Sequence, residues 1–156
     1  MTLNFNQVNI TTQEEIRHEF GRPYLDYLRE MNDTYVGYAD GKNVTSDTFY
    51  YKEIIEAMGG RYSELEYNKF NINWFYDIMQ DLPWFEDAPA VSHYKNYVLV
   101  INNYEEMLKE NENKKYIKYY IEYLENIVNW WTNEIITSMV GGPNARRNFT
   151  VLLVSS

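Results

Sequence analysis

The stretch that decides the fold is Tyr97-Val98-Leu99-Val100-Ile101, a run of five apolar residues with a polar residue on either side. A short apolar run with such flanks is typical of a β-strand that is buried on both faces of a sheet. Two further strands are predicted, one at 35–39, where an Asp40-Gly41 turn signal follows, and one at 149–154. Three strands spaced so widely along the chain need long connections.

Both connecting segments have apolar residues at helical spacing. Between the first two strands, the sequence predicts a helix that Ser46 or Asp47 caps and Gly59-Gly60 ends, and a second helix at about 69–82. Between the last two strands it predicts a short helix at about 103–110 and a long one at about 114–139. Strands that alternate with helices imply right-handed crossovers, so the predicted fold class is α/β, with a three-stranded parallel sheet flanked by helices.

Residues 1–34 precede all three predicted strands. Thr11-Thr12-Gln13-Glu14-Glu15 is a helix-start signal, with acidic residues placed in the first turn. Apolar residues then follow at helical spacing, and Gly21-Arg22-Pro23 is expected to break or kink that run. The sequence therefore predicts an N-terminal helical extension over 1–34 and a domain over 35–156.

The composition limits the classes of partner. The chain has 156 residues, a formal net charge of −9, 16 tyrosines and no cysteine. The absence of cysteine excludes a disulfide framework and a thiolate metal site. The acidic balance argues against direct binding of nucleic acid and is compatible with a basic partner, although excess charge can also serve solubility alone. The sequence shows neither an apolar run of membrane-spanning length nor a signal-peptide pattern, so we expect no membrane contact and a cytoplasmic location.

Motifs of enzyme chemistry are weak in this sequence. The two histidines, His18 and His93, stand far apart with no motif around either. Gly59-Gly60 and Gly141-Gly142 both follow predicted helices, where helix capping explains them better than phosphate binding does. Carboxylate pairs such as Glu14-Glu15 are typical of solvated helix faces, and no spacing of metal ligands stands out. We therefore expect no catalytic residues, no cofactor and no metal.

An aromatic and acidic cluster between residues 62 and 84 is the strongest candidate for a binding surface. Asn73, Asp77 and Asp81 recur at i, i+4 and i+8 of the predicted helix, on a different face from its apolar stripe. Tyrosine and tryptophan supply contact area at low entropy cost, and carboxylates complement a basic pocket. The alternative is that most of the rings belong to the core. The aromatic members of the cluster are Tyr62, Tyr67, Tyr76, Trp84 and Phe85.

The same segment resembles a known family. Asn71-Ile72-Asn73-Trp74-Phe75-Tyr76-Asp77-Ile78-Met79 is similar to the second helix of barstar-type inhibitors, and Asp81-Leu82-Pro83-Trp84 is similar to the ending common in barstar relatives. The flanks agree in order: an opening strand, a turn and a first helix, then a middle strand, and a hydrophobic last strand closed by Ser155. The resemblance covers roughly 35–156.

Barstar-type proteins bind a secreted ribonuclease inside its producer and fill its active site with carboxylates of the second helix. The resemblance implies an immunity or antitoxin protein whose principal inhibitory residue is Asp77. It also implies that Asn73 matches the preceding acidic position, Tyr76 the aromatic residue beside the main aspartate, and Tyr67 a loop tyrosine that covers the partner.

Three departures from the family pattern are visible. Asn73 replaces a carboxylate, and Lys69 stands where a glycine usually precedes the helix. The extension over 1–34, the loop over 83–96 and the long last helix exceed those of short family members. The expected partner is thus a basic toxin, a ribonuclease first of all. The alternatives are a binding module on the same scaffold against another partner, such as a host defence nuclease, and an enzyme with a carboxylate site.

Overall fold

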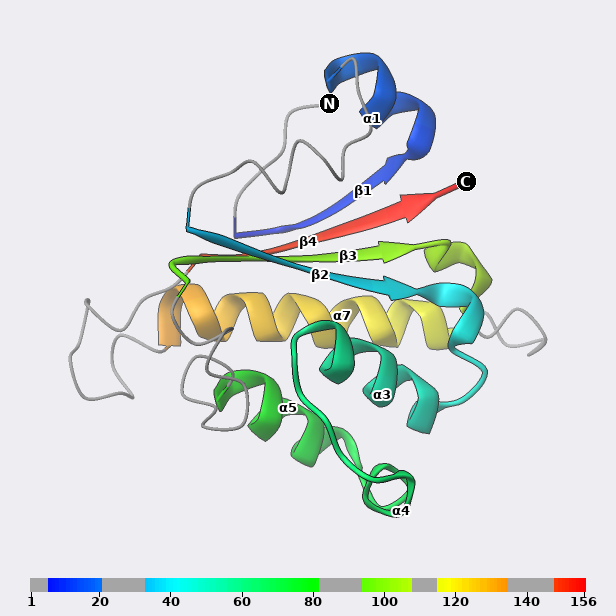
Figure 1. Ribbon diagram of the computed structural model, residues 1–156, viewed down its shortest axis with the longest axis vertical. Coiled ribbons are helices and arrows are strands. Elements are labelled where there is room, and N and C mark those ends of the chain that lie inside the picture. The colour runs from blue at the N-terminus through cyan, green and yellow to red at the C-terminus, as the bar shows by residue number, and fades with distance from the viewer. Residues whose placement is uncertain (1–5, 21–32, 82–93, 108–114, 135–147) are drawn as a thin grey trace.

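The computed structural model describes residues 6–20, 33–81, 94–107, 115–134 and 148–156. Four strands form one parallel sheet in the order β1-β4-β3-β2 (Figure 1). The strands are β1 (Val8–Thr12), β2 (Thr34–Asp40), β3 (Asn96–Asn102) and β4 (Asn148–Ser155). The α/β class, the parallel pairing and the three predicted strands are confirmed, each strand extending one residue or so beyond its predicted ends.

The predicted number of strands is wrong. β1 lies within residues 1–34, which the sequence assigns to a helical extension, and it pairs with β4 along its whole length, from Val8 beside Val151 to Thr12 beside Ser155. The helix that follows, α1 (Gln13–Phe20), begins where the Thr12 hydroxyl accepts a hydrogen bond from the Glu15 backbone N–H at 3.1 Å. The helix start was therefore predicted correctly, and the strand before it was missed.

Asparagine side chains attach β1 to β4. The Asn6 side-chain oxygen accepts the Phe149 backbone N–H at 3.0 Å, and the Asn6 backbone N–H reaches the Thr150 hydroxyl at 3.0 Å. Asn9 is buried, and its amide donates to the Val151 carbonyl at 3.2 Å. Polar side chains can occupy this buried edge because these hydrogen bonds replace those to water.

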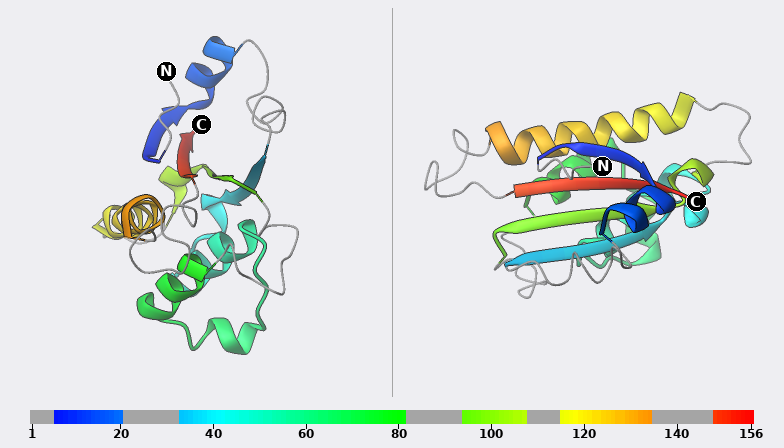
Figure 2. Two further views of the ribbon diagram at one scale, coloured as in Figure 1. Left: turned by 90° about the vertical axis from the view of Figure 1, so that its left-hand side faces the viewer. Right: turned by 90° about the horizontal axis from the view of Figure 1, so that it is seen from above.

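The face of the sheet on which a helix lies depends on the direction in which the chain crosses the sheet. From β2 through β3 to β4 the chain moves toward one edge, and α3 (Asp47–Ala57), α5 (Ile72–Asp81) and α7 (Lys115–Asn129) lie beneath one face (Figures 1 and 2). From β1 to β2 the chain crosses in the opposite direction, and α1 lies on the other face. A right-handed connection requires this change of face when the direction reverses.

The ends of the helices follow the predicted caps in part. The Ser46 hydroxyl accepts the Phe49 N–H at 3.3 Å at the start of α3, and Gly59 takes a left-handed conformation (φ 92°) after its end. The predicted helix at 69–82 begins only at Ile72, because a separate turn of helix, α4 (Glu64–Tyr67), precedes it. A 3-10 turn, η1 (Gly41–Asn43), follows β2, and another, η3 (Tyr104–Glu106), stands where a short helix was predicted. α7 continues as a π-helical turn, η4 (Trp130–Glu134).

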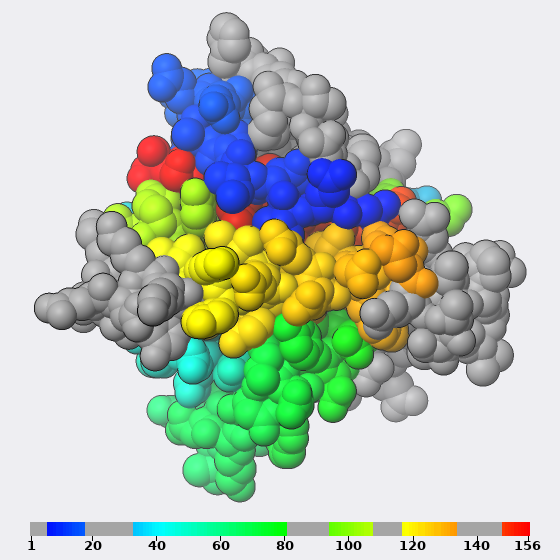
Figure 3. Space-filling model, turned by 180° about the vertical axis from the view of Figure 1, so that it is seen from behind, coloured from blue at the N-terminus to red at the C-terminus, as the bar shows by residue number. Residues whose placement is uncertain are grey.

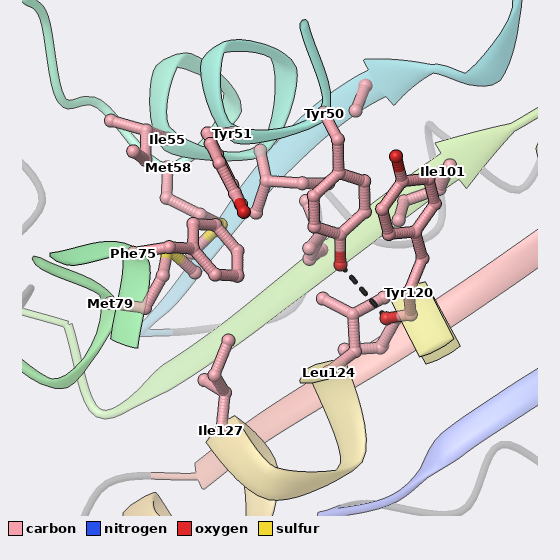
Figure 4. Packing of buried hydrophobic residues seen from close by; sticks show 14 of the residues in the cluster. Tyr50, Tyr51, Ile55, Met58, Phe75, Met79, Ile101, Tyr120, Leu124 and Ile127 are labelled. Carbon is pink, nitrogen blue, oxygen red and sulfur yellow. Dashed lines mark hydrogen bonds between the residues drawn. The ribbon is translucent and has the colours of Figure 1, made fainter. Parts of the chain in front are cut away.

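The main core lies between the sheet and the three helices. Figure 4 shows its centre, where Tyr50 and Phe75 from α3 and α5 meet Tyr120, Leu124 and Ile127 from α7. The opposite face of β3 is also buried, through Val98 and Val100, as its apolar run predicts. No helix in the part of the chain that the structure describes is long and apolar enough to cross a membrane.

Gly37 tests the contact between β2 and α3. A Cβ atom added there would lie 2.2 Å from the Ala57 carbonyl oxygen and 3.0 Å from the Met58 sulfur. Because backbone atoms form the obstacle, we expect Gly37→Ala to lower the free energy of unfolding by about 3 kcal/mol. Urea unfolding followed by circular dichroism measures the loss, with the exposed Lys42→Ala as control. A Gly37→Ala protein as stable as the control would show that β2 and α3 are not packed this closely.

Candidate functional site

The exposed face of α5 is the candidate site. The Asn71 side chain accepts the Trp74 backbone N–H at 3.1 Å and so caps the first turn of the helix. Phe75 and Met79 point into the core and are fully buried. Because the helix is held on this inner side, its outer side chains project from a fixed backbone.

Asn73 and Asp77 are the predicted residues that the structure brings together. Both are exposed, and they lie four residues apart on the same side of α5. Trp74 stands beside them with 51% of its surface exposed, and its ring lies 5.6 Å from the ring of Phe70. Tryptophan is enriched among the residues that contribute most to binding at protein interfaces.

Trp74 is the candidate contact residue that the sequence prediction missed. The sequence contains the signal, because position 74 falls outside the predicted apolar stripe of this helix. The stripe consists of Ile72, Phe75, Ile78, Met79 and Leu82. The prediction named Trp84 instead, and Trp84 lies outside the described residues. Asp81 is the last residue of α5, one turn beyond Asp77, and the structure does not describe its side chain.

Tyr67 does not stand where the resemblance implies. It is the last residue of α4, and only 1% of its surface is exposed. Its ring therefore cannot cover a partner. Its ring packs edge-on against Tyr62 and Phe70, with centroids 5.9 and 5.3 Å away. Tyr62, which is half-buried, contacts Phe70 in the same way at 5.2 Å. These ring contacts therefore hold together the segment that leads into α5.

Tyr76 joins α5 to α7. Its ring lies edge-on to Tyr123 at 6.0 Å, and its hydroxyl accepts a hydrogen bond from the Asn126 side chain at 3.0 Å. The residue is half-buried, so its outer edge can contact a partner while its inner side fixes the helix. The core interpretation of the aromatic cluster thus holds for Tyr67, whereas Tyr76 lies at the boundary between core and surface.

Two stacked tyrosines hold the helical layer behind the site. The rings of Tyr50 and Tyr120 are parallel with centroids 4.0 Å apart, and the Tyr50 hydroxyl donates to the Tyr120 carbonyl at 2.9 Å (Figure 4). The Tyr120 hydroxyl donates in turn to the carboxylate of Asp47 at the start of α3. The two bonds tie α3 to α7, and Phe75 of α5 packs on the Tyr50 ring at 5.4 Å.

The carboxyl edge of the sheet is the place where an α/β enzyme would keep its active site. Polar side chains gather there, but they bond to one another. Asn103 donates to Asp40 at 3.1 Å, Gln13 donates to Asn102 at 3.3 Å, and the Ser156 hydroxyl donates to Glu105 at 2.8 Å. No group of three or more metal-ligating side chains occurs among the described residues.

Comparison with known proteins adds no family to this description. No family model, curated protein or solved structure matches the chain.

Buried tyrosines predict how stability depends on pH. Burial raises the pKa of Tyr51 and of Tyr67 to about 12, and the carboxylates of Asp47 and Glu56 add to the respective shifts. Burial also raises the pKa of Tyr50, and burial with the hydrogen bond to Asp47 raises that of Tyr120. In the unfolded chain these groups titrate near 10.

Because the folded state holds these protons more tightly, their contribution to stability is complete below pH ~10 and is lost as the pH rises through the folded values. We expect Tyr51 and Tyr67 to ionise only as the pH approaches about 12, together with unfolding, because their pKa values are near 10 only in the unfolded chain. Tyrosinate absorbance and circular dichroism, recorded on the same samples, measure both events. One smooth titration of all tyrosines near pH ~10, with the fold retained, would contradict the buried positions.

Proposed function

We propose that this protein binds a basic protein toxin and occludes its active site through the exposed face of α5, and that the toxin is a ribonuclease. The observation that carries the proposal is the position of Asp77. Its carboxylate is exposed beside Asn73 and Trp74, on a helix whose other side is fixed by Phe75 and Met79. We place the complex in the cytoplasm of the cell that makes the toxin.

The chemistry of a ribonuclease pocket explains why this surface suits it. Such a pocket holds a phosphate among arginine, lysine and histidine side chains. A carboxylate on a rigid helix can occupy the position of that phosphate and accept charge-assisted hydrogen bonds. Little conformational entropy is lost on binding because the helix is already ordered. The inhibitor itself then needs no catalytic chemistry.

The distribution of charge favours a basic partner. The segment 46–81, which contains α3, α4 and α5, carries seven acidic and three basic side chains, a net charge of −4. Glu64 and Glu66 of α4 are exposed, and α4 directly precedes α5 in the chain. The negative field of this side attracts a basic protein before contact is made.

The arrangement of the strands also supports the proposal. β2, β3 and β4 are neighbours in one parallel sheet, and their connecting helices lie on one face. The resemblance to barstar-type inhibitors implies a parallel sheet of these three strands flanked by helices. The departures at Asn73 and Lys69, both exposed, change the charge of the contact surface, so the toxin is expected to differ from the partners of the short family members.

Truncation of Asp77 tests the contact. The full chain is immobilised, the protein that it captures from its native host is identified, and inhibition of RNA cleavage by the captured protein is assayed. We expect Asp77→Ala to lose about 2–5 kcal/mol of binding free energy, as desolvated charge pairs in protein interfaces do, because it leaves cations of the partner unpaired. Its stability should stay within about 1 kcal/mol of the parent, since Asp77 is exposed.

Two further variants make the result specific. Glu14→Ala removes the same charge from an exposed position on α1, on the other face of the sheet, and should bind normally. Asn73→Asp restores the carboxylate of the family pattern and should tighten binding if the pocket is cationic. An Asp77→Ala protein that binds as well as Glu14→Ala would refute the assignment. Capture of a partner without nuclease activity would instead favour a binding module on the same scaffold.

The salt dependence of association tests the role of charge. We expect the association rate with the captured toxin to fall steeply between low and physiological ionic strength, where the screening length is about 8 Å. Stopped-flow fluorescence at several salt concentrations measures it. A rate that stays constant would indicate that apolar contacts, such as those of Trp74, dominate the encounter.

A further inference from the structure

The outer edge of β1 carries backbone groups that the described sheet does not use. Val8 and Ile10 lie beside Val151 and Leu153 of β4, and the Gln7 carbonyl accepts the Val151 N–H. In a parallel pair of this register, the N–H and C=O of Gln7, Asn9 and Thr11 face β4, and those of Val8 and Ile10 face away. No described strand lies on that far side of β1.

A groove with apolar and charged side chains accompanies this edge. Ile10 has 60% of its surface exposed, and beneath it a hollow of about 540 Å³ separates β1 from Ile117 and Ile121 of α7. A second hollow of about 340 Å³ continues beside Val8 and shares Glu125 with the first. Figure 3 shows β1 lying directly along α7 on the surface of the molecule. Edge strands of this kind add a further strand readily.

We propose that a second copy of this chain fills the groove, with the two β1 strands paired antiparallel about a two-fold axis at Ile10. Ile10 then exchanges both backbone hydrogen bonds with Ile10 of the second copy, and Val8 faces Thr12. Residues 1–13 contain no charged side chain, although the chain as a whole carries −9. The strand β1 itself therefore adds no charged side chain to an interface between two acidic molecules.

The flank of α7 is complementary to itself under the same axis. Lys118 and Glu125 line the groove seven residues apart, about two helical turns. Two α7 helices that cross the axis antiparallel bring Lys118 of each copy toward Glu125 of the other, with Ile117 and Ile121 between the pairs. The same arrangement places Glu122 of both copies near the axis. Glu122→Gln removes these two like charges and is expected to tighten the association.

The proposed pairing is independent of the proposed inhibitor function. α7 lies between the groove and the α4–α5 side of the molecule (Figure 3), so both surfaces can be occupied at once. Two copies joined at β1 form one continuous sheet of eight strands and present two α5 faces.

Sedimentation equilibrium of the purified full chain tests the proposal. We expect a monomer–dimer equilibrium that tightens as salt rises, because screening weakens the repulsion between two molecules of charge −9. Ile10→Glu places two carboxylates opposite each other, beside Glu122 and Glu125 of the groove, and should weaken the dimer at least about tenfold. Leu65→Glu is the matched control, since it places the same carboxylate at a leucine that is 68% exposed on α4, and it should dimerise normally.

A charge-swap series fixes the register. Lys118→Glu and Glu125→Lys should each weaken the dimer, by about fivefold, and the double variant should restore it. Hydrogen exchange supplies a second readout, because the outward N–H of Ile10 should become protected as the protein concentration rises.

A chain that stays monomeric into the high micromolar range overturns the proposal. So does a dimer that Ile10→Glu leaves intact, or a charge swap that the double variant does not rescue. Binding of an added extended peptide at β1 by a chain that remains monomeric would assign the edge to a different occupant and would equally reject the second copy.

Discussion

Burial of β3 on both faces is the constraint on which the rest of the structure depends. Its five apolar residues are all buried, so each face of the sheet must be covered. The three helices α3, α5 and α7 cover one face, and Ile16 of α1 is buried on the other side. On this other side, β1 adds a strand to the sheet and α1 follows it directly. The N-terminal segment is thus part of the sheet rather than an addition to it.

The strands that the sequence predicts and the one that it misses differ in a physical way. Residues 97–101 and 149–154 are continuous apolar runs, which a central parallel strand requires. In β1 the pattern is reversed: Asn9 and Thr11 are buried, and Ile10 is exposed. The buried amide of Asn9 donates to the Val151 carbonyl, which lies 142 residues away in the sequence. Periodicity along the chain contains no information about such a partner.

The same distinction applies to the candidate site. The spacing of Asn73 and Asp77 against an apolar stripe depends only on the helical repeat, so their exposure was predictable. The positions of the tyrosines depend on tertiary packing. Tyr67 is buried because Tyr62 and Phe70 cover it, and Tyr76 is half-buried because Asn126 and Tyr123 meet it from α7. Aromatic residues serve a core and an interface equally well, so composition alone cannot assign them.

The position of β4 between β1 and β3 bears on how the chain assembles during synthesis. β1 is made first among the strands, yet its only described neighbour, β4, is made last, and the hydrogen bond from the Asn6 N–H to Thr150 spans 144 residues. Until β4 emerges, β1 has no strand to pair with and β3 has an open edge. Contacts between such distant segments slow folding because the entropy of closing the long loop is lost before the contacts form. For that interval the nascent chain exposes two unpaired strand edges, and chaperones or fast completion of synthesis would protect it from joining with its neighbours on the same messenger.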